Sequence, residues 1–315
     1  MRAIGRRFVQ LVIVLLLVTM FTALLIDLLP GDPVVTLVPF GSDEQRTQVR
    51  EELKLDKPLP VRYWDWLTGF VQGDMGKYYA VSSGRPVSDD VKHALPLTAQ
   101  LMLYAEVLAL VLAIPLGVLT AYRAGTWFDK TANTTAFALL AIPDFALALV
   151  LAYYVGVKLK WVPNTYVPAG NPGHFKSFVL PAVSLAAGQL AVYMRLLRSD
   201  MIATLQEDFI TMAKAKGMKP GRILWRHALR PSSLTLLTVA GLSVGTLIGG
   251  TLVLEVIFGI PGIGRLIGQA IIQRQYVALQ SLVALVALAY VLVNFLVDIL
   301  YTILDPRIRH ARALG

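Results

Sequence analysis

Six long apolar runs alternate with polar stretches along the chain, and each has about the 20 residues that a helix needs to cross a bilayer. The runs are Phe8–Leu29, Leu97–Tyr122, Thr134–Val157, Phe178–Leu197, Thr235–Val256 and Leu282–Leu304. The polar stretches are short, apart from the segment Pro30–Pro96 and a basic segment at residues 199–233. The pattern predicts an all-α membrane protein with six transmembrane helices.

Lys and Arg gather in alternate polar stretches, and such residues are retained on the cytoplasmic side of a membrane. We therefore expect both termini and residues 199–233 to be cytoplasmic and residues 30–96 to be extracytoplasmic. The first run is too long for a signal peptide and lacks an Ala-x-Ala cleavage site, so residues 1–29 are predicted to remain as an anchor helix. The five later runs form a core at 97–304, followed by a cytoplasmic tail at 305–315.

Composition narrows the function. Hydrophobic residues make up 56% of the chain and the mean hydropathy is +0.63, which is too apolar for an ordinary soluble domain. The formal charge of +9 is explained by sidedness and does not require nucleic acid. There is no cysteine, no pair of histidines at metal-ligand spacing and no G-x-x-x-x-G-K-[ST] phosphate loop. We expect no catalytic residue, metal or cofactor in this chain, and any ATP that drives it must bind another subunit.

The segment from Glu207 to Pro231 predicts a short helix and a turn. Thr204 and Glu207 have the spacing of a capping box, which predicts a helix beginning here. Phe209, Met212 and Ala213 then fall on one face at positions i, i+3 and i+4 and form an apolar ridge. Gly217 predicts the end of this helix, and Pro220 opposes its continuation. The result is a two-part helical elbow on the cytoplasmic face.

Arginines recur every four residues after the turn, at Arg222, Arg226 and Arg230. Such a basic stripe suits anionic lipid headgroups or an acidic partner.

Acidic residues within the apolar runs are candidates for the translocation path, because a charge inside a bilayer usually faces a cavity or a partner. Asp144 follows Pro143 near the middle of the third run, and we expect it either to face the path and attract a cationic group or to find a structural partner. Glu255 and Asp298 lie near the ends of their runs, where a hydrogen bond or snorkelling to the interface explains them.

Two further patterns have structural interpretations. Gly241, Gly245 and Gly249 form a stripe of small residues at four-residue intervals, which predicts close helix packing rather than a G-x-S-x-G hydrolase site. The glycine-rich stretch 259–264 predicts a tight external turn. In residues 61–71, the aromatic sequence VRYWDWLTGFV predicts a packed extracytoplasmic cap or, alternatively, a surface for an external partner.

A family resemblance rests on an ordered set of short motifs. The stretch AKAKG followed by LWRHALRP is similar to the cytoplasmic EAA loop of the dipeptide/oligopeptide permease family of ATP-binding-cassette importers. Further motifs that resemble this family occur in order along the chain, at Leu29–Pro33, Ile114–Gly117, Leu180–Ala182, Phe258–Arg265 and Leu304–Arg307. Thr211 and Met212 depart from the general pattern, which has Glu and Ala there, and Asp144 stands where related permeases commonly have a small polar residue.

The resemblance implies a type I importer permease fold in a bacterial inner membrane, with peptides as substrate. It implies that the elbow is a coupling helix seated in a groove of an ATPase subunit, with contacts from Glu207, Phe209, Met212, Ala213, Lys216 and Gly217. The implied partners are a second homologous permease, two ATPase subunits that bind ATP and Mg²⁺, and an extracytoplasmic substrate-binding protein.

Other functions stay open at this point. The same family carries nickel chelates and glutathione, so either is an alternative substrate. A secondary transporter or channel is the alternative from another class, although such transporters commonly contain paired repeats and no internal repeat is evident here.

Overall fold

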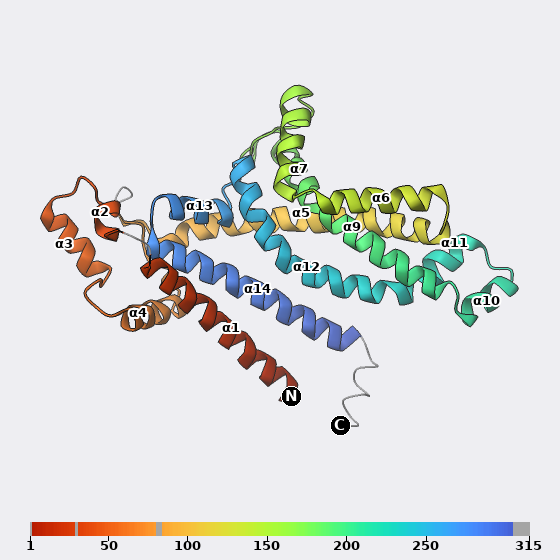
Figure 1. The fold of residues 1–315 in the computed structure, drawn as a ribbon, viewed down its shortest axis with the longest axis horizontal. Helices are drawn as coiled ribbons and strands as arrows, with labels where there is room; N and C mark the ends of the chain where they lie inside the picture. Colours follow the sequence, from red (N-terminus) through yellow and green to blue (C-terminus); the bar gives the residue numbers. More distant parts are fainter. Residues whose placement is uncertain (1, 29–30, 80–83, 305–315) are drawn as a thin grey trace. The chain divides into compact units, whose positions relative to one another are not determined.

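The computed structural model describes residues 2–28, 31–79 and 84–304, and within them the regular elements are helices joined by turns (Figure 1). One isolated antiparallel bridge joins Lys77 to Pro86. The chain divides into two compact units, unit 1 at residues 1–98 and 260–295, and unit 2 at residues 99–259 and 296–315. Each unit is described in turn.

Unit 1 contains the N-terminal helix and most of the predicted extracytoplasmic segment. The helices are α1 (Arg2–Asp27), α2 (Pro33–Leu37), α3 (Asp43–Glu52), α4 (Leu59–Val71), the start of α5 (Val87–Tyr122), α13 (Ile263–Ile272) and most of α14 (Tyr276–Leu304). Ser42 caps α3 with a complete capping box, in which its side chain accepts from the Gln45 backbone and Gln45 reaches back. A small core gathers Met75, Val87, Ile263 and Leu282.

The aromatic helix α4 packs against α1 and α14 within unit 1. The Tyr63 hydroxyl is 2.8 Å from Thr19 Oγ1, and Trp66 Nε1 donates to Ser281 Oγ at 2.9 Å. Phe70 stacks on Trp66 with ring centroids 5.3 Å apart. Trp64, on the opposite face, is 63% exposed. The aromatic sequence is therefore mainly a packed cap, because the buried Tyr63 and the half-buried Trp66 find hydrogen-bond partners on neighbouring helices.

Unit 2 is an apolar helix bundle. Its helices are most of α5, α6 (Trp127–Ala141), α7 (Asp144–Leu151), the π-helical turn η1 (Ala152–Lys158), α8 (His174–Ser177), α9 (Val179–Thr204), α10 (Asp208–Ala215), α11 (Pro220–Arg222), the π-helical turn η2 (Ile223–Ala228) and α12 (Leu229–Phe258). Helix α9 packs against α6, α7 and α12. Alanines line the core on α5, where Ala109 and Ala113 are fully buried and allow close helix approach.

The third apolar run is not one straight helix, as its length had suggested. It forms α6 and α7, which meet at a bend of 99° (Figure 1). Pro143 has no backbone N–H, and it forces Ile142 into an extended conformation with φ −93° and ψ 121°. Five helices pass the length and apolarity test for membrane spans, or six when this bent pair is one span.

Two helices extend beyond the predicted pattern. Helix α5 begins at Val87, ten residues before the predicted apolar run, so its first three turns belong to the segment that was predicted to be extracytoplasmic. The stretch after Gly259 is more than a turn, because α13 follows it. Helix α13 buries Ile263 and Ala270 and leaves Ile272 83% exposed, an i, i+7 pattern visible in the sequence.

Candidate functional site

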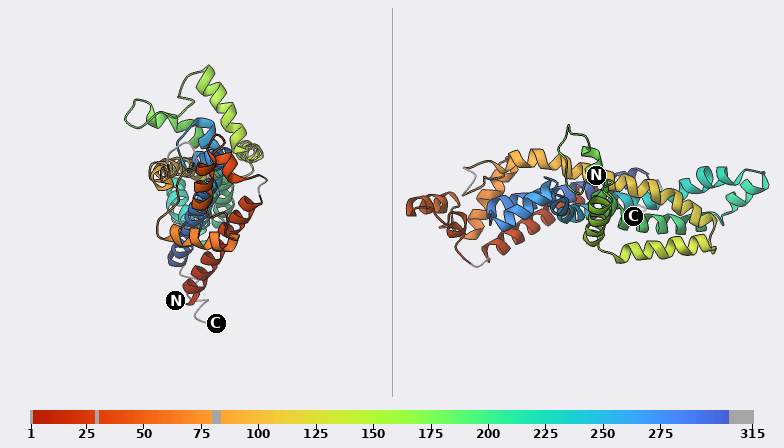
Figure 2. Two further views of the ribbon diagram at one scale, coloured as in Figure 1. Left: turned by 90° about the vertical axis from the view of Figure 1, so that its left-hand side faces the viewer. Right: turned by 90° about the horizontal axis from the view of Figure 1, so that it is seen from above.

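The elbow, residues 207–230, lies at one end of unit 2 (Figure 2). Its first helix, α10, begins at Asp208 with Glu207 as the N-cap residue, and no side chain caps it. The predicted capping box was wrong. Thr204 is the last residue of α9, and its Oγ1 lies 2.9 Å from Ser232 Oγ on α12, which joins the two ends of the elbow.

Helix α10 ends where the glycine predicted. Gly217 has φ +72°, in the left-handed region that favours glycine. Its N–H donates to the Lys214 carbonyl at 2.9 Å, and the Met218 N–H donates to the Ala213 carbonyl at 3.3 Å. These two bonds form a Schellman motif, which satisfies carbonyls at the helix end and fixes the direction of the chain. The elbow is thus a short, firmly terminated helix.

The expected apolar ridge is divided between the interior and the surface. Ala213 is buried beside Ile210, which is completely buried and which the sequence reading had missed. Both side chains join the core of unit 2. Phe209 and Met212 instead stay 41% and 59% exposed. Ala213 therefore anchors α10, and the side chains free for a partner are Phe209 and Met212.

The second part of the elbow leads directly into α12. Lys219 is extended before Pro220, and α11, η2 and α12 then run on as one helical element. Arg222, Arg226 and Arg230 are all exposed, as the predicted stripe requires. Ile223 and Leu224 are buried between them, so the same turn attaches the elbow to the core.

Glu207 and Lys216 flank α10, and both side chains are exposed. The elbow therefore presents charged groups around the exposed pair Phe209 and Met212.

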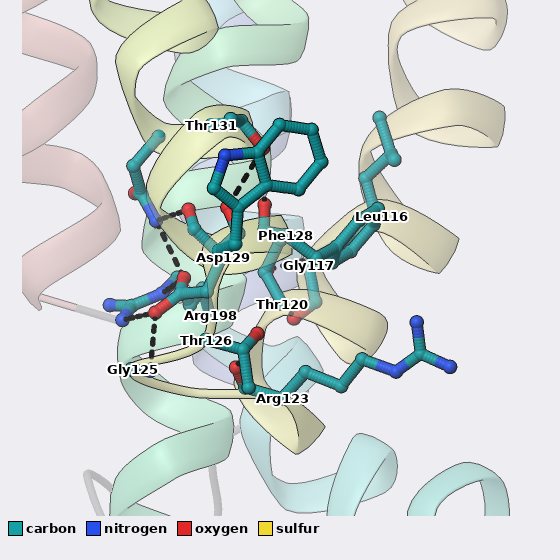
Figure 3. A network of polar contacts seen from close by, with 12 residues as sticks. Leu116, Gly117, Thr120, Arg123, Gly125, Thr126, Phe128, Asp129, Thr131 and Arg198 are labelled. Carbon is teal, nitrogen blue, oxygen red and sulfur yellow. Dashed lines mark hydrogen bonds and ion pairs between the residues drawn. The ribbon is translucent and has the colours of Figure 1, made fainter.

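A buried ion pair on a neighbouring turn was missed from the sequence. Arg198 on α9 donates from Nε and Nη2 to the two carboxylate oxygens of Asp129, at 2.5 and 2.7 Å (Figure 3). Asp129 is 3% exposed and also accepts from the Gly125 N–H at 2.8 Å and from Asn133 Nδ2 at 2.7 Å. The pair is bidentate and fully hydrogen-bonded, which favours a buried charge. It fixes the turn between α5 and α6 onto α9.

The acidic candidates within the apolar runs have different surroundings. Glu255 is fully buried and has an interaction within the chain. Asp298 lies outside the residues whose side chains the structure describes. Glu106, a further acidic residue within an apolar run, lies on α5 and accepts a hydrogen bond from the Tyr193 hydroxyl at 2.9 Å. Asp144 begins α7, is half-buried and has no hydrogen-bond or ion-pair partner among the described residues.

The three glycines of the predicted packing stripe differ from one another. A Cβ at Gly241 would come within 2.8 Å of Val297 on α14, so only glycine allows this approach. Gly245 is buried. Gly249 has no atom within 4 Å of such a Cβ, so the packing expected there is not seen among the described residues. The adjacent residue Gly250 makes the close helix contact instead, because a Cβ added there would lie 2.7 Å from the Leu185 side chain on α9.

Unit 1 contains a polar cavity of about 570 Å³. Its basic residues pair with acidic residues of the same lining, Arg50 with Asp32, Arg62 with Asp27 and Lys54 with Asp65. The hydrogen bond from Lys54 lowers the pKa of the Asp65 carboxyl. Burial raises the pKa of the Tyr79 hydroxyl, another lining group, to about 12.

No cluster of three or more His, Cys, Asp or Glu side chains suited to a metal ion occurs in the described part of the chain.

Comparison with known proteins identifies two matching family descriptions. Residues 113–310 match the family described as binding-protein-dependent transport system inner membrane component, and residues 1–102 match the N-terminal region of such components. The oligopeptide transport system permease protein AppB of Bacillus subtilis is 38% identical over 97% of this chain and 98% of that protein. The glutathione transport system permease protein GsiC of Pectobacterium atrosepticum is 34% identical with the same coverage.

A solved structure supports the fold. A chain from the structure titled as inward facing conformations of the MetNI methionine ABC transporter superposes with a TM-score of 0.57. The match covers 69% of this chain and 96% of that chain at 16% identity. At this identity the likeness concerns the arrangement of helices alone.

Proposed function

Because the chain belongs to the family of binding-protein-dependent transport system inner membrane components, we propose that it is one of two similar permease subunits of an ATP-driven peptide importer. The chain itself is a multi-pass inner membrane protein. Peptides are favoured as substrate because a relative that is 38% identical is named as an oligopeptide transport system permease. A binding protein outside the cell delivers the peptide, and two partner ATPases bind ATP and Mg²⁺.

One observation carries the coupling role. The exposed Phe209 and Met212 stand on a helix whose other face, at Ile210 and Ala213, is locked into the core of unit 2. Exposed apolar side chains ringed by polar groups suit a protein interface. A force applied to α10 is transmitted to α9 and α12, because the Thr204–Ser232 contact joins them at its base. We propose that α10 is the coupling helix that an ATPase groove receives.

The charged side chains of the elbow, including the arginine stripe, surround the proposed contact surface at Phe209 and Met212. Arg222, Arg226 and Arg230 supply positive charge for anionic headgroups or an acidic rim of the groove. This role requires residues 199–233 to be cytoplasmic, with both termini on the same side, as the distribution of Lys and Arg predicts.

Glutathione is the second candidate substrate, because a relative with similar identity is named as a glutathione permease. Glutathione is itself a small peptide, so the membrane path needs no different chemistry. Competition between glutathione and unrelated tripeptides for uptake separates the two substrates.

Site-directed crosslinking tests the coupling role in the assembled transporter. The chain has no native cysteine, so Met212→Cys introduces a single thiol. We expect it to crosslink to an ATPase subunit that carries a cysteine in its groove, with a yield that changes when ATP is added. Phe40→Cys is the matched control, because Phe40 is fully exposed and belongs to the predicted extracytoplasmic segment.

An uptake assay in proteoliposomes is the second test of the coupling role. Met212→Asp places a charge in an apolar contact and is expected to lower ATP-driven uptake at least about tenfold, the effect of losing a central apolar anchor. Phe40→Asp should leave uptake unchanged. Uptake by wild-type chain without any ATPase subunit would refute the importer and favour a secondary transporter or channel.

A further inference from the structure

We propose that the Asp144 carboxylate is a binding site for the amino-terminal ammonium group of the transported peptide. The inference rests on the proposed importer function and names the chemical group that the path recognises. It comes from the meeting of three helices of unit 2 at the bend between α6 and α7.

The bend determines where the carboxylate lies. Pro143 is extended, with φ −59° and ψ 139°, and Asp144 is the first residue of α7. The negative side chain therefore stands in the first turn of a helix, at the positive end of the helix dipole. An unbroken helix through residue 144 would lack this end.

Two glycines border the carboxylate, one on each neighbouring helix. A Cβ at Gly188 on α9 would lie 3.5 Å from Asp144 Oδ1, and a Cβ at Gly250 on α12 would lie 3.7 Å from Oδ2. Each oxygen thus faces backbone that carries no side chain. The carboxylate is half-buried, so one side is open to a ligand.

No group in the described part of the chain neutralises this charge. The contrast is with Asp129, which is also in an apolar bundle but receives a bidentate arginine and two further donors. A charge left unpaired in an apolar environment costs free energy, and such groups usually serve a ligand or a path. A single carboxylate favours one small cation with N–H donors over a metal ion, which needs several oxygen ligands.

A polar pair links α9 and α12 close in sequence to the two glycines. Gln189 follows Gly188 on α9 and donates from Nε2 to Thr246 Oγ1 on α12 at 3.2 Å. Thr246 precedes Gly250 by one helical turn and is exposed. This amide and hydroxyl join the two helices that carry the glycines.

Uptake by the complete transporter, with its ATPases and binding protein, tests the proposal. The substrate pair is one tripeptide with a free amino terminus and the same tripeptide N-acetylated, each supplied at a concentration that saturates the binding protein. Asp144→Asn is expected to lower uptake of the free tripeptide by about tenfold, as the loss of a charged hydrogen-bond partner implies, and to leave the acetylated one unchanged. Asp144→Glu should restore part of the activity.

A glycine pair gives a matched steric test. Gly188→Ala fills space beside Oδ1 of Asp144 without coming within 4 Å of another described side chain, and should lower uptake of the free tripeptide severalfold. Gly249→Ala is the control, since nothing lies within 4 Å of its Cβ, and should have no effect.

Two results would overturn the inference. Equal loss of both tripeptides in Asp144→Asn, with a lower melting temperature of the complex, would show that the carboxylate pairs with a basic side chain of the second permease. Unchanged uptake of both tripeptides by Asp144→Asn would show that the Asp144 carboxylate does not bind the peptide. Failure of the wild-type transporter to carry any peptide would instead refute the proposed function itself.

Discussion

Two short polar connections of unit 2 use their charges in opposite ways. In the turn between α5 and α6, Asp129 is buried and bonded to Arg198, Gly125 and Asn133. In the elbow, all eight Asp, Glu, Lys and Arg side chains are exposed, and none forms an ion pair with a described residue. Both connections look alike in sequence, since each is polar, contains a glycine with positive φ and joins two apolar helices.

The difference indicates which connection is structural and which is free for a partner. The buried Asp129 carboxylate accepts four hydrogen bonds, which hold its turn against α9 and commit its oxygens to partners within the chain. Exposed charges around Phe209 and Met212 add little to stability, because isolated surface charges contribute little. They remain available for electrostatic contact with another subunit.

The largest expected effect comes from breaking the buried pair. Arg198→Ala leaves the Asp129 carboxylate buried without its cation and should destabilise the protein by about 3–5 kcal/mol. Thermal unfolding of the purified protein in detergent measures the loss. Arg222→Ala, an exposed arginine of the elbow, is the control and should change stability by less than about 0.5 kcal/mol. Equal effects of the two substitutions would remove the distinction between the connections.

A smaller effect is expected at the glycine that ends α10. Gly217→Ala places a side chain at φ +72°, which should cost about 1 kcal/mol although nothing lies within 4 Å of the new Cβ. Gly221→Ala is the matched control, because its surroundings are equally open and its φ is not positive. We expect only Gly217→Ala to increase proteolysis of the elbow. Similar proteolysis of both variants would show that the Schellman motif does not hold the helix end.

The smallest effect is expected from the arginine stripe. Replacing Arg222, Arg226 and Arg230 together by Gln should change thermal stability by less than about 1 kcal/mol, since all three are exposed and unpaired. The same variant should make ATP-driven uptake less sensitive to salt, because salt screens exposed charges. A large drop in melting temperature would contradict the view that these charges serve a partner.

Much of the fold follows from local patterns. Apolar runs located the spans, and the glycine followed by a proline located the end of α10, because both signals depend on neighbours within a few residues. The predicted capping box at Thr204 was wrong because a contact between residues distant in the sequence took its place. The Thr204 hydroxyl had two possible partners, and it bonds Ser232, 28 residues away, instead of a backbone N–H nearby.

The sequence predicted where α10 lies along the chain, but it did not predict which face of this helix is exposed. The spacing of Phe209, Met212 and Ala213 placed them near one another on a helix, but it did not reveal which of them the core would cover. Ile210 is completely buried, so the side of α10 that carries Ile210 faces the core, and Ala213 on the same side is buried too. The Asp129–Arg198 pair was beyond sequence patterns, since 69 residues separate its members.

The sequence by itself determined the membrane class, the approximate spans, the lack of a phosphate-binding loop and the helical elbow, because these depend on composition and short-range periodicity. Only the tertiary structure decided which charged side chains have an ion-pair or hydrogen-bond partner and which do not. Asp129 and Asp144 are the same residue type near the two ends of α6, yet one faces an arginine and the other faces two glycines. That outcome depends on which helices meet in space, because burial and pairing are set by neighbours that are distant along the chain.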